Sequence, residues 1–195
     1  MGDERTVEQL LADLGTNTGL DFFETYQTLK QRADKQAVQP LIKMIDEVID
    51  DGIRFDTLDY IIDILFGLRD ERAIEPIVNV LHRIESQTAL GLIVFENHAT
   101  PFLVRALTSE YPVARYNAAY LLYHSRFYNG TIVEPLIAVA LDKDEHFGIR
   151  SQAIWSLGKI GDKRAIEPLI SLLNDENERV RSMARSSIDT IRANS

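Results

Sequence analysis

The sequence predicts an all-α protein built as an α-solenoid, in which pairs of helices repeat along the chain. Three observations lead to this prediction. A short motif that ends in proline recurs, and apolar residues recur at spacings of three and four. No run alternates apolar and polar residues between turn residues, as a half-buried strand would. Each copy of the proline motif is expected to start the first helix of one pair.

The recurring motif runs from an aspartate to a proline six residues later. It occurs as Asp34–Pro40, Asp70–Pro76 and Asp162–Pro168, and a version without the aspartate ends at Pro135. With Pro101 included, the prolines are 36, 25, 34 and 33 residues apart, so all but one step fits a helix–turn–helix unit. Proline is tolerated near a helix start, and aspartate is a good N-cap. First helices are therefore expected to begin near residues 35, 71, 100, 131 and 163.

A second helix is expected after each first helix, with arginine at one register near its start. The clearest starts are Ala114-Arg115, Ile149-Arg150 and Val180-Arg181. Arginines that share a register predict a ladder of bonds from one repeat to the next, as do Asp70 and Asp162 in the turns. Small residues four positions after each start are expected to let neighbouring helices approach closely: Ala118, Ala153 and Ala184.

Helix ends and the core follow from the same pattern. Gly67, Gly158 and Gly161 are expected where helices stop, and Asp175 with Glu178 has capping-box spacing for the last helix. The uncharged run 88–95 is expected to be a short buried helix, with an exposed apolar patch as the alternative. The expected core of the last repeats consists of Leu136, Ile137, Leu141, Leu157, Ile160, Leu169, Ile170 and Leu172.

The repeat motifs resemble the HEAT-like repeats of the phycobilisome-lyase type. The resemblance rests on Asp162–Ile170, on the Val-Arg-x-x-Ala pattern at Val180–Ala184, and on Leu157–Asp162. It implies a HEAT-like or armadillo-type α-solenoid of about five helical hairpins, forming a single domain over residues 1–195. Residues 1–33, which the resemblance does not cover, are expected to be capping helices, and 34–195 the repeats.

Composition and charge exclude several classes of protein. Residues 1–99 hold 19 acidic and 9 basic residues, and residues 100–195 hold 11 and 12, so the net charge of −9 argues against nucleic-acid binding. The chain has no cysteine, no leader-like apolar run at its start and no apolar run long enough to span a bilayer. A cytoplasmic protein without a membrane partner is therefore expected.

Motifs for catalysis or for a cofactor are missing from the sequence. The four histidines have neither a second histidine nor a cysteine at metal-ligand spacing, so no metal site is expected. The chain also lacks the His-Glu dipeptides of HEAT-repeat di-iron hydroxylases, a phosphate-binding loop and a nucleophile elbow. These absences favour a protein that is not an enzyme and needs no cofactor.

Aromatic residues supply the candidate binding site. In such solenoids the second helices line the concave side, which is the usual binding surface. We number slots from the first residue of each second-helix start (Ala114, Ile149, Val180). Slots +2 and +6 are then four residues apart and share a helix face. If Leu58 starts an earlier second helix, these slots hold the candidate residues Tyr60, Ile64, Tyr116, Tyr120 and Trp155. They are expected to form an exposed aromatic stripe, with ordinary packing between helices as the alternative.

Two functions fit these expectations. The first is a non-catalytic scaffold or adaptor that binds a partner protein or peptide on its concave face, because aromatic residues are enriched at interfaces. The second follows from the family resemblance, which implies a bilin lyase subunit or another factor that handles an open-chain tetrapyrrole or a phycobiliprotein.

Overall fold

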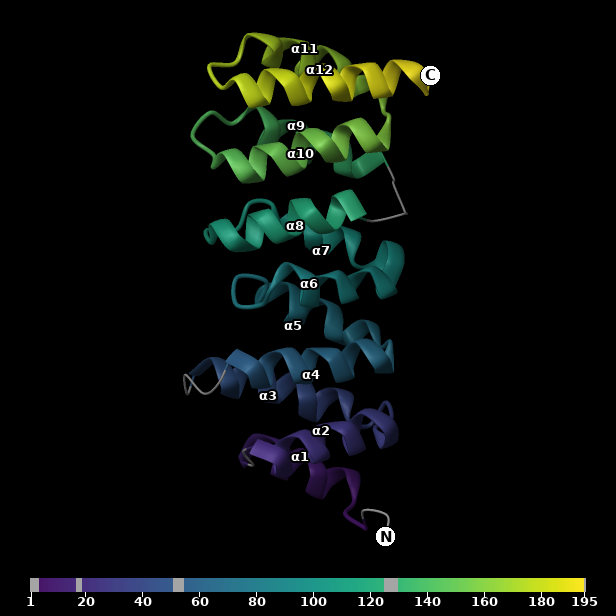
Figure 1. Ribbon diagram of the computed structural model, residues 1–195. Helices are drawn as coiled ribbons and strands as arrows, with labels where there is room; N and C mark the ends of the chain where they lie inside the picture. The colour runs from purple at the N-terminus through teal and green to yellow at the C-terminus, as the bar shows by residue number, and fades with distance from the viewer. Residues whose placement is uncertain (1–3, 17–18, 51–54, 125–129, 195) are drawn as a thin grey trace. The chain divides into compact units, whose positions relative to one another are not determined.

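The computed structural model describes residues 4–16, 19–50, 55–124 and 130–194, which are mostly helical and contain no strand (Figure 1). The α-helices are α1 (Val7–Thr16), α2 (Gly19–Arg32), α3 (Val38–Asp50), α4 (Phe55–Leu68), α5 (Ile74–Asn79), α6 (Ser86–Ala89), α7 (Thr100–Ala106), α8 (Pro112–His124), α9 (Val133–Leu141), α10 (Phe147–Ile160), α11 (Ile166–Ser171) and α12 (Glu178–Ala193). The 3-10 helices are η1 (Glu71–Ala73), η2 (Leu90–His98), η3 (Gly130–Ile132), η4 (Lys163–Ala165) and η5 (Leu172–Asn174). In this part of the chain no helix is both long and apolar enough to cross a membrane.

Five regular helix pairs account for most of the described chain, as the repeat predicted. The pairs α1–α2, α3–α4, α7–α8, α9–α10 and α11–α12 each pack against each other. The expected starts near 71, 100, 131 and 163 are confirmed, since η1, α7, η3 and η4 begin at residues 71, 100, 130 and 163. The turn at residues 35–37 delays α3 to Val38. The fold is therefore an α-solenoid of the HEAT and armadillo type.

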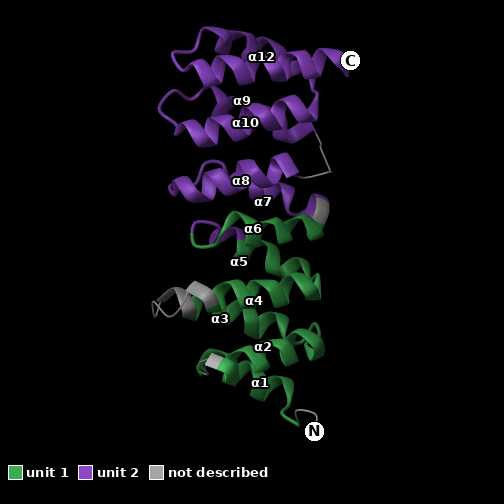
Figure 2. Ribbon diagram, viewed as in Figure 1, with its two compact units in different colours: residues 1–77, 83–95 green, residues 78–82, 96–195 purple. Residues whose placement is uncertain are grey.

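Contacts divide the chain into two compact units (Figure 2). Unit 1 comprises residues 1–77 and 83–95, and unit 2 comprises residues 78–82 and 96–195. Unit 1 contains α1–α4 and α6, and unit 2 contains α7–α12. The expectation of a single domain over residues 1–195 stays a prediction.

The aspartate of the repeat motif caps the first helix and fixes the arginine two residues later. Asp70 accepts a hydrogen bond from the backbone N–H of Arg72, and its two carboxylate oxygens accept bonds from the Arg72 side chain. The Nη2 atom of Arg72 also donates to the carbonyl oxygen of Lys35, in the preceding repeat, at 3.2 Å. In unit 2, Asp162 and Arg164 repeat this arrangement, with Arg164 Nη2 bonded to the carbonyl oxygen of Gly130 at 2.9 Å. The predicted aspartate ladder thus bonds repeats through the arginine.

The arginine ladder of the second helices is present within unit 2. Arg115 donates to Glu145 in the loop of the next repeat at 3.0 Å, and Arg150 donates to Asp175 in the loop after it at 2.6 Å. The Arg150–Asp175 pair is buried, with exposed side-chain fractions of 7% and 5%. Arg181 instead donates to carbonyl oxygens of its own loop. The capping-box expectation for α12 is wrong, because the N-cap is Asn177 and the Asp175 carboxylate is bonded to Arg150.

The core prediction for the last repeats holds for five residues of eight. Leu136, Ile137, Leu157, Leu169 and Leu172 are buried. The prediction for Leu141 is wrong, because this residue is the last of α9 and 38% of its surface is exposed. Ile160 and Ile170 are only half-buried.

The uncharged run 88–95 is partly buried in unit 1, mostly as the 3-10 helix η2, so the expected buried helix is met in part and no exposed patch is formed. Leu92 is fully buried and Phe95 nearly so, and no residue of the run is fully exposed. The Phe95 ring lies 6.2 Å from that of Phe66 on α4. A Cβ atom on Gly91 would overlap the Phe66 ring, so the backbone of η2 lies directly on that ring.

Small residues let α10 and α12 approach closely. Gly161 ends α10 in the left-handed conformation, as expected, with φ 75°. Gly158 lies inside α10 and is buried, so its expected place at a helix end is wrong. A Cβ atom on Gly158 would lie 2.6 Å from Ser187 Oγ and 3.0 Å from Ser187 Cα on α12. Gly158 is therefore required for the spacing of the two helices.

We expect Gly158→Ala to lower the free energy of unfolding by about 1–3 kcal/mol, because overpacking shifts α10 from α12. The matched change Gly67→Ala meets no atom within 4 Å and should raise the free energy of unfolding by about 0.5–1 kcal/mol, as alanine favours a helix. Urea denaturation of both variants measures the difference. Equal effects of the two substitutions would contradict the close approach.

Removing the buried partner of Arg150 should be costly. We expect Asp175→Ala to lower the free energy of unfolding by about 3–5 kcal/mol, because the guanidinium of Arg150 is then buried without its counter-charge. Glu176→Ala, the exposed neighbour, should change it by less than about 0.5 kcal/mol. Chemical denaturation monitored by circular dichroism tests the pair, and similar losses for both would argue against a role for the buried charge.

The carboxylates that are hydrogen-bonded to arginine side chains predict that the protein loses stability in acid. Hydrogen bonds from the Arg72 side chain lower the pKa of Asp70 from 3.8 to about 2. Hydrogen bonds from Arg164, Arg150 and Arg115 likewise lower the pKa values of Asp162, Asp175 and Glu145. A lowered carboxyl pKa stabilises the fold above the unfolded value and ceases to do so as the pH falls through the folded value. The free energy of unfolding should therefore fall between about pH 4.5 and about pH 2.

Urea denaturation at a series of pH values measures this dependence. Asp162→Asn should flatten it, because one shifted carboxyl is removed. A free energy of unfolding that stays constant through this range would contradict the assignment of the four carboxylates.

Candidate functional site

The exposed face of α10 carries a large aromatic side chain where a surface helix normally has polar residues. Trp155, the sole tryptophan of the chain, has 52% of its surface exposed. Ser151 and Lys159 lie four residues before and after it, so the three side chains form a row along α10. Between them lie the buried residues Ala153, Ile154 and Leu157. Burial of one face of α10 thus leaves Trp155 on the other.

Two hollows lie beside Trp155, between α10 and α12. The first, which we call the lysine hollow because Lys159 lines it, has a volume of about 430 Å³ and also reaches α8. Its lining residues are Tyr123, Trp155, Gly158, Lys159, Ser182, Met183, Ser186, Ser187 and Thr190. The arginine hollow has a volume of about 440 Å³ and is lined by Phe147, Ser151, Gln152, Trp155, Arg179, Ser182, Met183. Trp155, Ser182 and Met183 line both hollows, so the two adjoin along α10 and α12, and together we call them the groove.

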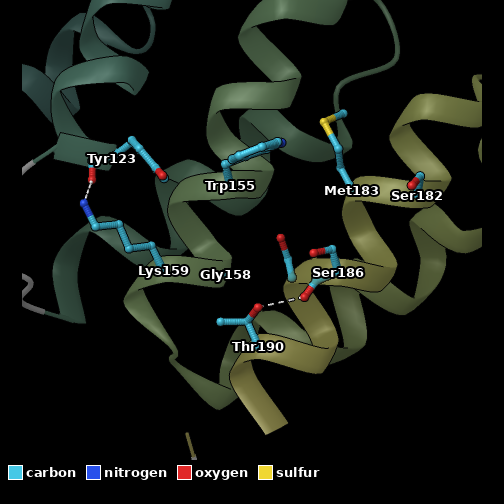
Figure 3. Close-up of a pocket in the computed structure, with 9 residues that line it drawn as sticks. Tyr123, Trp155, Gly158, Lys159, Ser182, Met183, Ser186 and Thr190 are labelled. Carbon is cyan, nitrogen blue, oxygen red and sulfur yellow. Dashed lines mark hydrogen bonds between the residues drawn. The ribbon is translucent and has the colours of Figure 1, made fainter. Parts of the chain in front are cut away.

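Figure 3 shows how the lysine hollow is built. Trp155 projects from α10, and Met183 projects from the neighbouring α12. Lys159 donates to the backbone carbonyl oxygen of Tyr123 at 2.6 Å, and its Nζ atom lies 4.5 Å from the centre of the Tyr123 ring. Because Tyr123 is the next-to-last residue of α8, Lys159 places a positive charge at the C-terminal end of that helix. The position of this cation is thereby fixed at the edge of the hollow.

The groove is lined by cations and neutral side chains. Lys159 lines one hollow and Arg179 the other, and neither hollow has an aspartate or glutamate among its lining residues. The serine hydroxyls of Ser182 and Ser186 on α12 lie between them. The groove therefore combines an exposed tryptophan, hydroxyl groups and two positive charges.

The aromatic row of α8 lies beside this groove. Tyr116 and Tyr120 are half-buried and their rings are stacked, 6.2 Å apart. Tyr116 accepts a long hydrogen bond, 3.5 Å, from Gln152 on α10, and the Tyr123 ring lies edge-on to Trp155 at 6.4 Å. Tyr120 also contacts His124, whose pKa is lowered by burial and by the charge of Lys159. The candidate residues Tyr116, Tyr120 and Trp155 thus lie on adjacent helices of unit 2.

In unit 1, Tyr60 belongs to a separate aromatic cluster. Its ring, half-buried, packs at 5.1 Å on Phe22 and at 4.6 Å on Tyr26, both on α2. Beside it Tyr26 donates to Asp63 at 2.5 Å, and Lys30 is ion-paired with Asp63 at 2.6 Å. Burial and the hydrogen bond to Asp63 raise the pKa of Tyr26. Tyr60 is thus held by packing between α2 and α4.

The placement of Ile64 on the exposed face is wrong. Ile64 is 2% exposed and lies in the core of unit 1. The burial pattern of α4 matches that of α10 when Thr57, rather than Leu58, is aligned with Ile149. A shift by one residue turns a position by about 100° around the helix, which moves Ile64 from the surface to the interior. In the corrected register the slots of Ser151 and Trp155 are occupied in α4 by Asp59 and Asp63.

The predicted aromatic stripe does not include most of the residues that line the groove. Lys159 and His124 occupy slot +10, one further turn along the row, and extending the rule by four residues finds them. The same rule on α12 gives Ser182, Ser186 and Thr190, which line the lysine hollow. Tyr123, Met183 and Arg179 lie outside these slots. Only the packing of the neighbouring helices places them beside Trp155.

The histidines have structural contacts within the described ranges. His146 is the N-cap of α10 and accepts a hydrogen bond from the backbone N–H of Gly148. The His82 ring stacks on Tyr111 at 4.1 Å. Over residues 4–16, 19–50, 55–124 and 130–194, no group of three or more histidine, aspartate or glutamate side chains is arranged to hold a metal ion.

Comparison with known proteins identifies the repeats of unit 2. The family model for HEAT repeats matches residues 100–189, which contain α7–α11 and most of α12. This part of the chain therefore consists of HEAT-like repeats. The finer resemblance to the phycobilisome-lyase type stays a prediction. A comparison with curated proteins finds none that matches the chain.

Solved structures show similarity in fold alone. A designed armadillo repeat protein in complex with the peptide (KR)4 is 13% identical, with 96% of this chain and 100% of that chain covered and a TM-score of 0.52. Human deoxyhypusine hydroxylase in complex with glycerol is also 13% identical, covering 96% of this chain and 84% of its own, at a TM-score of 0.48. A second designed armadillo repeat protein is 14% identical, with 95% and 100% covered and a TM-score of 0.47.

Proposed function

We propose that this α-solenoid, whose residues 100–189 are HEAT-like repeats, is a non-catalytic scaffold that binds a segment of a partner protein in the groove of α10 and α12. The exposure of Trp155 is the observation on which the proposal depends. A half-exposed tryptophan leaves a large apolar area in water, and burying it against a partner is favourable.

The shape of the groove supports a bound segment. Each hollow, at about 430–440 Å³, falls within the range of roughly 300–1,000 Å³ found for ligand pockets, so it has room for side chains of a peptide. Met183 lines both hollows, and its flexible thioether adapts to apolar side chains of different shape. Tyrosines on α8 extend the surface next to it. Tryptophan and tyrosine are also the residues most often found at the energetic centre of interfaces.

The fold supports the same proposal. In solenoids of this kind the second helices of successive repeats build an extended binding surface. The designed armadillo repeat protein with similar fold holds the peptide (KR)4. On this chain the second helices of the last three repeats are α8, α10 and α12.

A bilin is the second candidate ligand, because the lysine hollow joins aromatic rings to a cation. Trp155 and Tyr123 would stack on an open-chain tetrapyrrole, and Lys159 would pair with a propionate group. Absorbance titration with phycocyanobilin tests this candidate. A spectral shift that Trp155→Ala abolishes would favour it over a peptide.

Trp155→Ala should weaken the binding of a partner segment by about thirtyfold or more, because central anchors typically contribute over 2 kcal/mol. Panning random displayed peptides against the protein, with counter-selection on the Trp155→Ala variant, supplies the probes. Fluorescence anisotropy then gives dissociation constants for both proteins. The fold should be little affected, since half of the side chain lies in solvent.

Val113→Ala is the matched control, because Val113 is 51% exposed in unit 2 but lines neither hollow. It should leave the dissociation constants unchanged. Binding in this groove is refuted if no peptide is enriched. It is also refuted if the enriched peptides bind the wild-type protein and the Trp155→Ala variant equally well.

A further inference from the structure

We infer that the segment bound in the groove is acidic, with an apolar residue beside Trp155 and carboxylates on either side that reach Lys159 and Arg179. This inference rests on the proposed function and adds the chemistry of the partner. Its basis is the contrast between the charge of the groove and that of the chain.

The groove is cationic in a chain whose net charge is −9. The sequences of α8 and α10 contain no aspartate or glutamate. Their arginines, Arg115 and Arg150, are ion-paired and line neither hollow, so Lys159 supplies the charge of these two helices to the groove. The acidic residues of α12, Glu178 and Asp189, are exposed but line neither hollow. A basic segment would therefore meet like charge at Lys159 and Arg179, whereas an acidic segment would meet complementary charge.

The slots of Ser151 and Trp155 carry acidic residues in unit 1. In the register set by burial, Asp59 and Asp63 of α4 occupy the slots that hold Ser151 and Trp155 in α10. Asp63 is paired with Lys30 and bonded to Tyr26. The row that carries Trp155 in unit 2 therefore has no cationic counterpart on α4, and the groove's cations, Lys159 and Arg179, lie on α10 and α12.

The side chains of the groove suit carboxylates in particular. Arg179 lies in the first turn of α12, is exposed, and makes no side-chain hydrogen bond or ion pair to any described residue. A guanidinium can bind a carboxylate through two parallel hydrogen bonds. At the other end, Lys159 is held in place by its bond to the Tyr123 carbonyl oxygen. Ser182 and Ser186 add hydroxyl donors between the two cations.

The helix geometry sets the spacing of the carboxylates. The second helices α10 and α12 run in the same direction, since each follows a first helix in its own repeat. Arg179 is in the first turn of α12 and Lys159 in the last turn of α10, so along the helix axes they are separated by about three turns, or roughly 16 Å. An extended chain spans this distance with about five residues. The preferred segment therefore has two acidic residues about five positions apart, with the apolar residue between them.

The peptides selected by panning are the first test. Enrichment of aspartate or glutamate at this spacing around an apolar residue supports the inference. Peptides that depend on Trp155 but are basic or neutral overturn it and leave the scaffold function standing. If no peptide is enriched, the proposed function and the inference fail together.

Charge variants of the protein are the second test, with the tightest selected peptide as the probe. Arg179→Glu should weaken its binding roughly five- to thirtyfold, because an attraction of up to about 1 kcal/mol is replaced by a similar repulsion. Arg185→Glu is the matched control, since Arg185 is exposed on α12 outside both hollows, and it should change binding less than about threefold. Equal effects of Arg179→Glu and Arg185→Glu overturn the inference.

Two further measurements guard against a folding effect. Lys159→Gln removes the second cation while keeping a donor for the Tyr123 carbonyl oxygen, and it should also weaken the acidic peptide. Replacing the acidic residues of that peptide by glutamine or by lysine should weaken binding progressively, with the protein unchanged. A lysine-substituted peptide that binds as tightly as the acidic one overturns the inference.

Discussion

The second helices of unit 2 pack closely enough for buried serine hydroxyls on one helix to meet backbone carbonyl oxygens of the next. The Ser156 hydroxyl on α10 donates to the carbonyl oxygen of Gln152 in its own helix and lies 3.3 Å from that of Ala119 on α8. Ser187 on α12 donates to the carbonyl oxygen of Ile154 on α10. Both hydroxyls occupy the same slot, and both are buried. A hydroxyl on Cβ reaches a carbonyl of the next helix only if the two backbones are close. Gly158 allows this close approach, because a Cβ atom at its position would overlap Ser187.

The candidate site depends on this close stacking. Because equal slots of α8, α10 and α12 are brought side by side, a row of side chains on one helix continues onto the next. Trp155 has small or flexible neighbours on α12, namely Ser182, Met183 and Ser186. Space remains on both sides of the indole for this reason. A bulky residue in any of these three slots would fill the hollows and bury the tryptophan.

The repeat was predictable from sequence because its signals are local. Asp70 and Asp162 cap helices within two residues, and proline marks a helix start without reference to the rest of the fold. The family model also reaches back to residue 100, across a repeat whose motif is weak. The prediction that Ile64 belongs to the exposed face was wrong for a different reason. Its face depends on which residue of α4 aligns with Ile149, and α4 lacks the arginine that fixes this register in α8, α10 and α12.

Contacts between helices were harder to predict. Asp175 looked like a helix cap because its sequence spacing suits one, yet a buried arginine 25 residues earlier binds its carboxylate. Arg179 carries no pattern that distinguishes it from other surface cations. Only the arginine hollow beside Trp155 separates it from the rest.

The bonds made by Arg72 and Arg164 join two of the repeats to the repeats before them through unlike surfaces. The arginine of one repeat binds a backbone carbonyl at the start of its predecessor, at Lys35 in one case and at Gly130 in the other. A backbone acceptor is present whatever the side chain, so the joint does not depend on the sequence of the preceding repeat. Such a head-to-tail joint is compatible with gene duplication, because a copied repeat brings its own donor and finds an acceptor already in place. The length of a solenoid of this kind is thus open to evolution one repeat at a time.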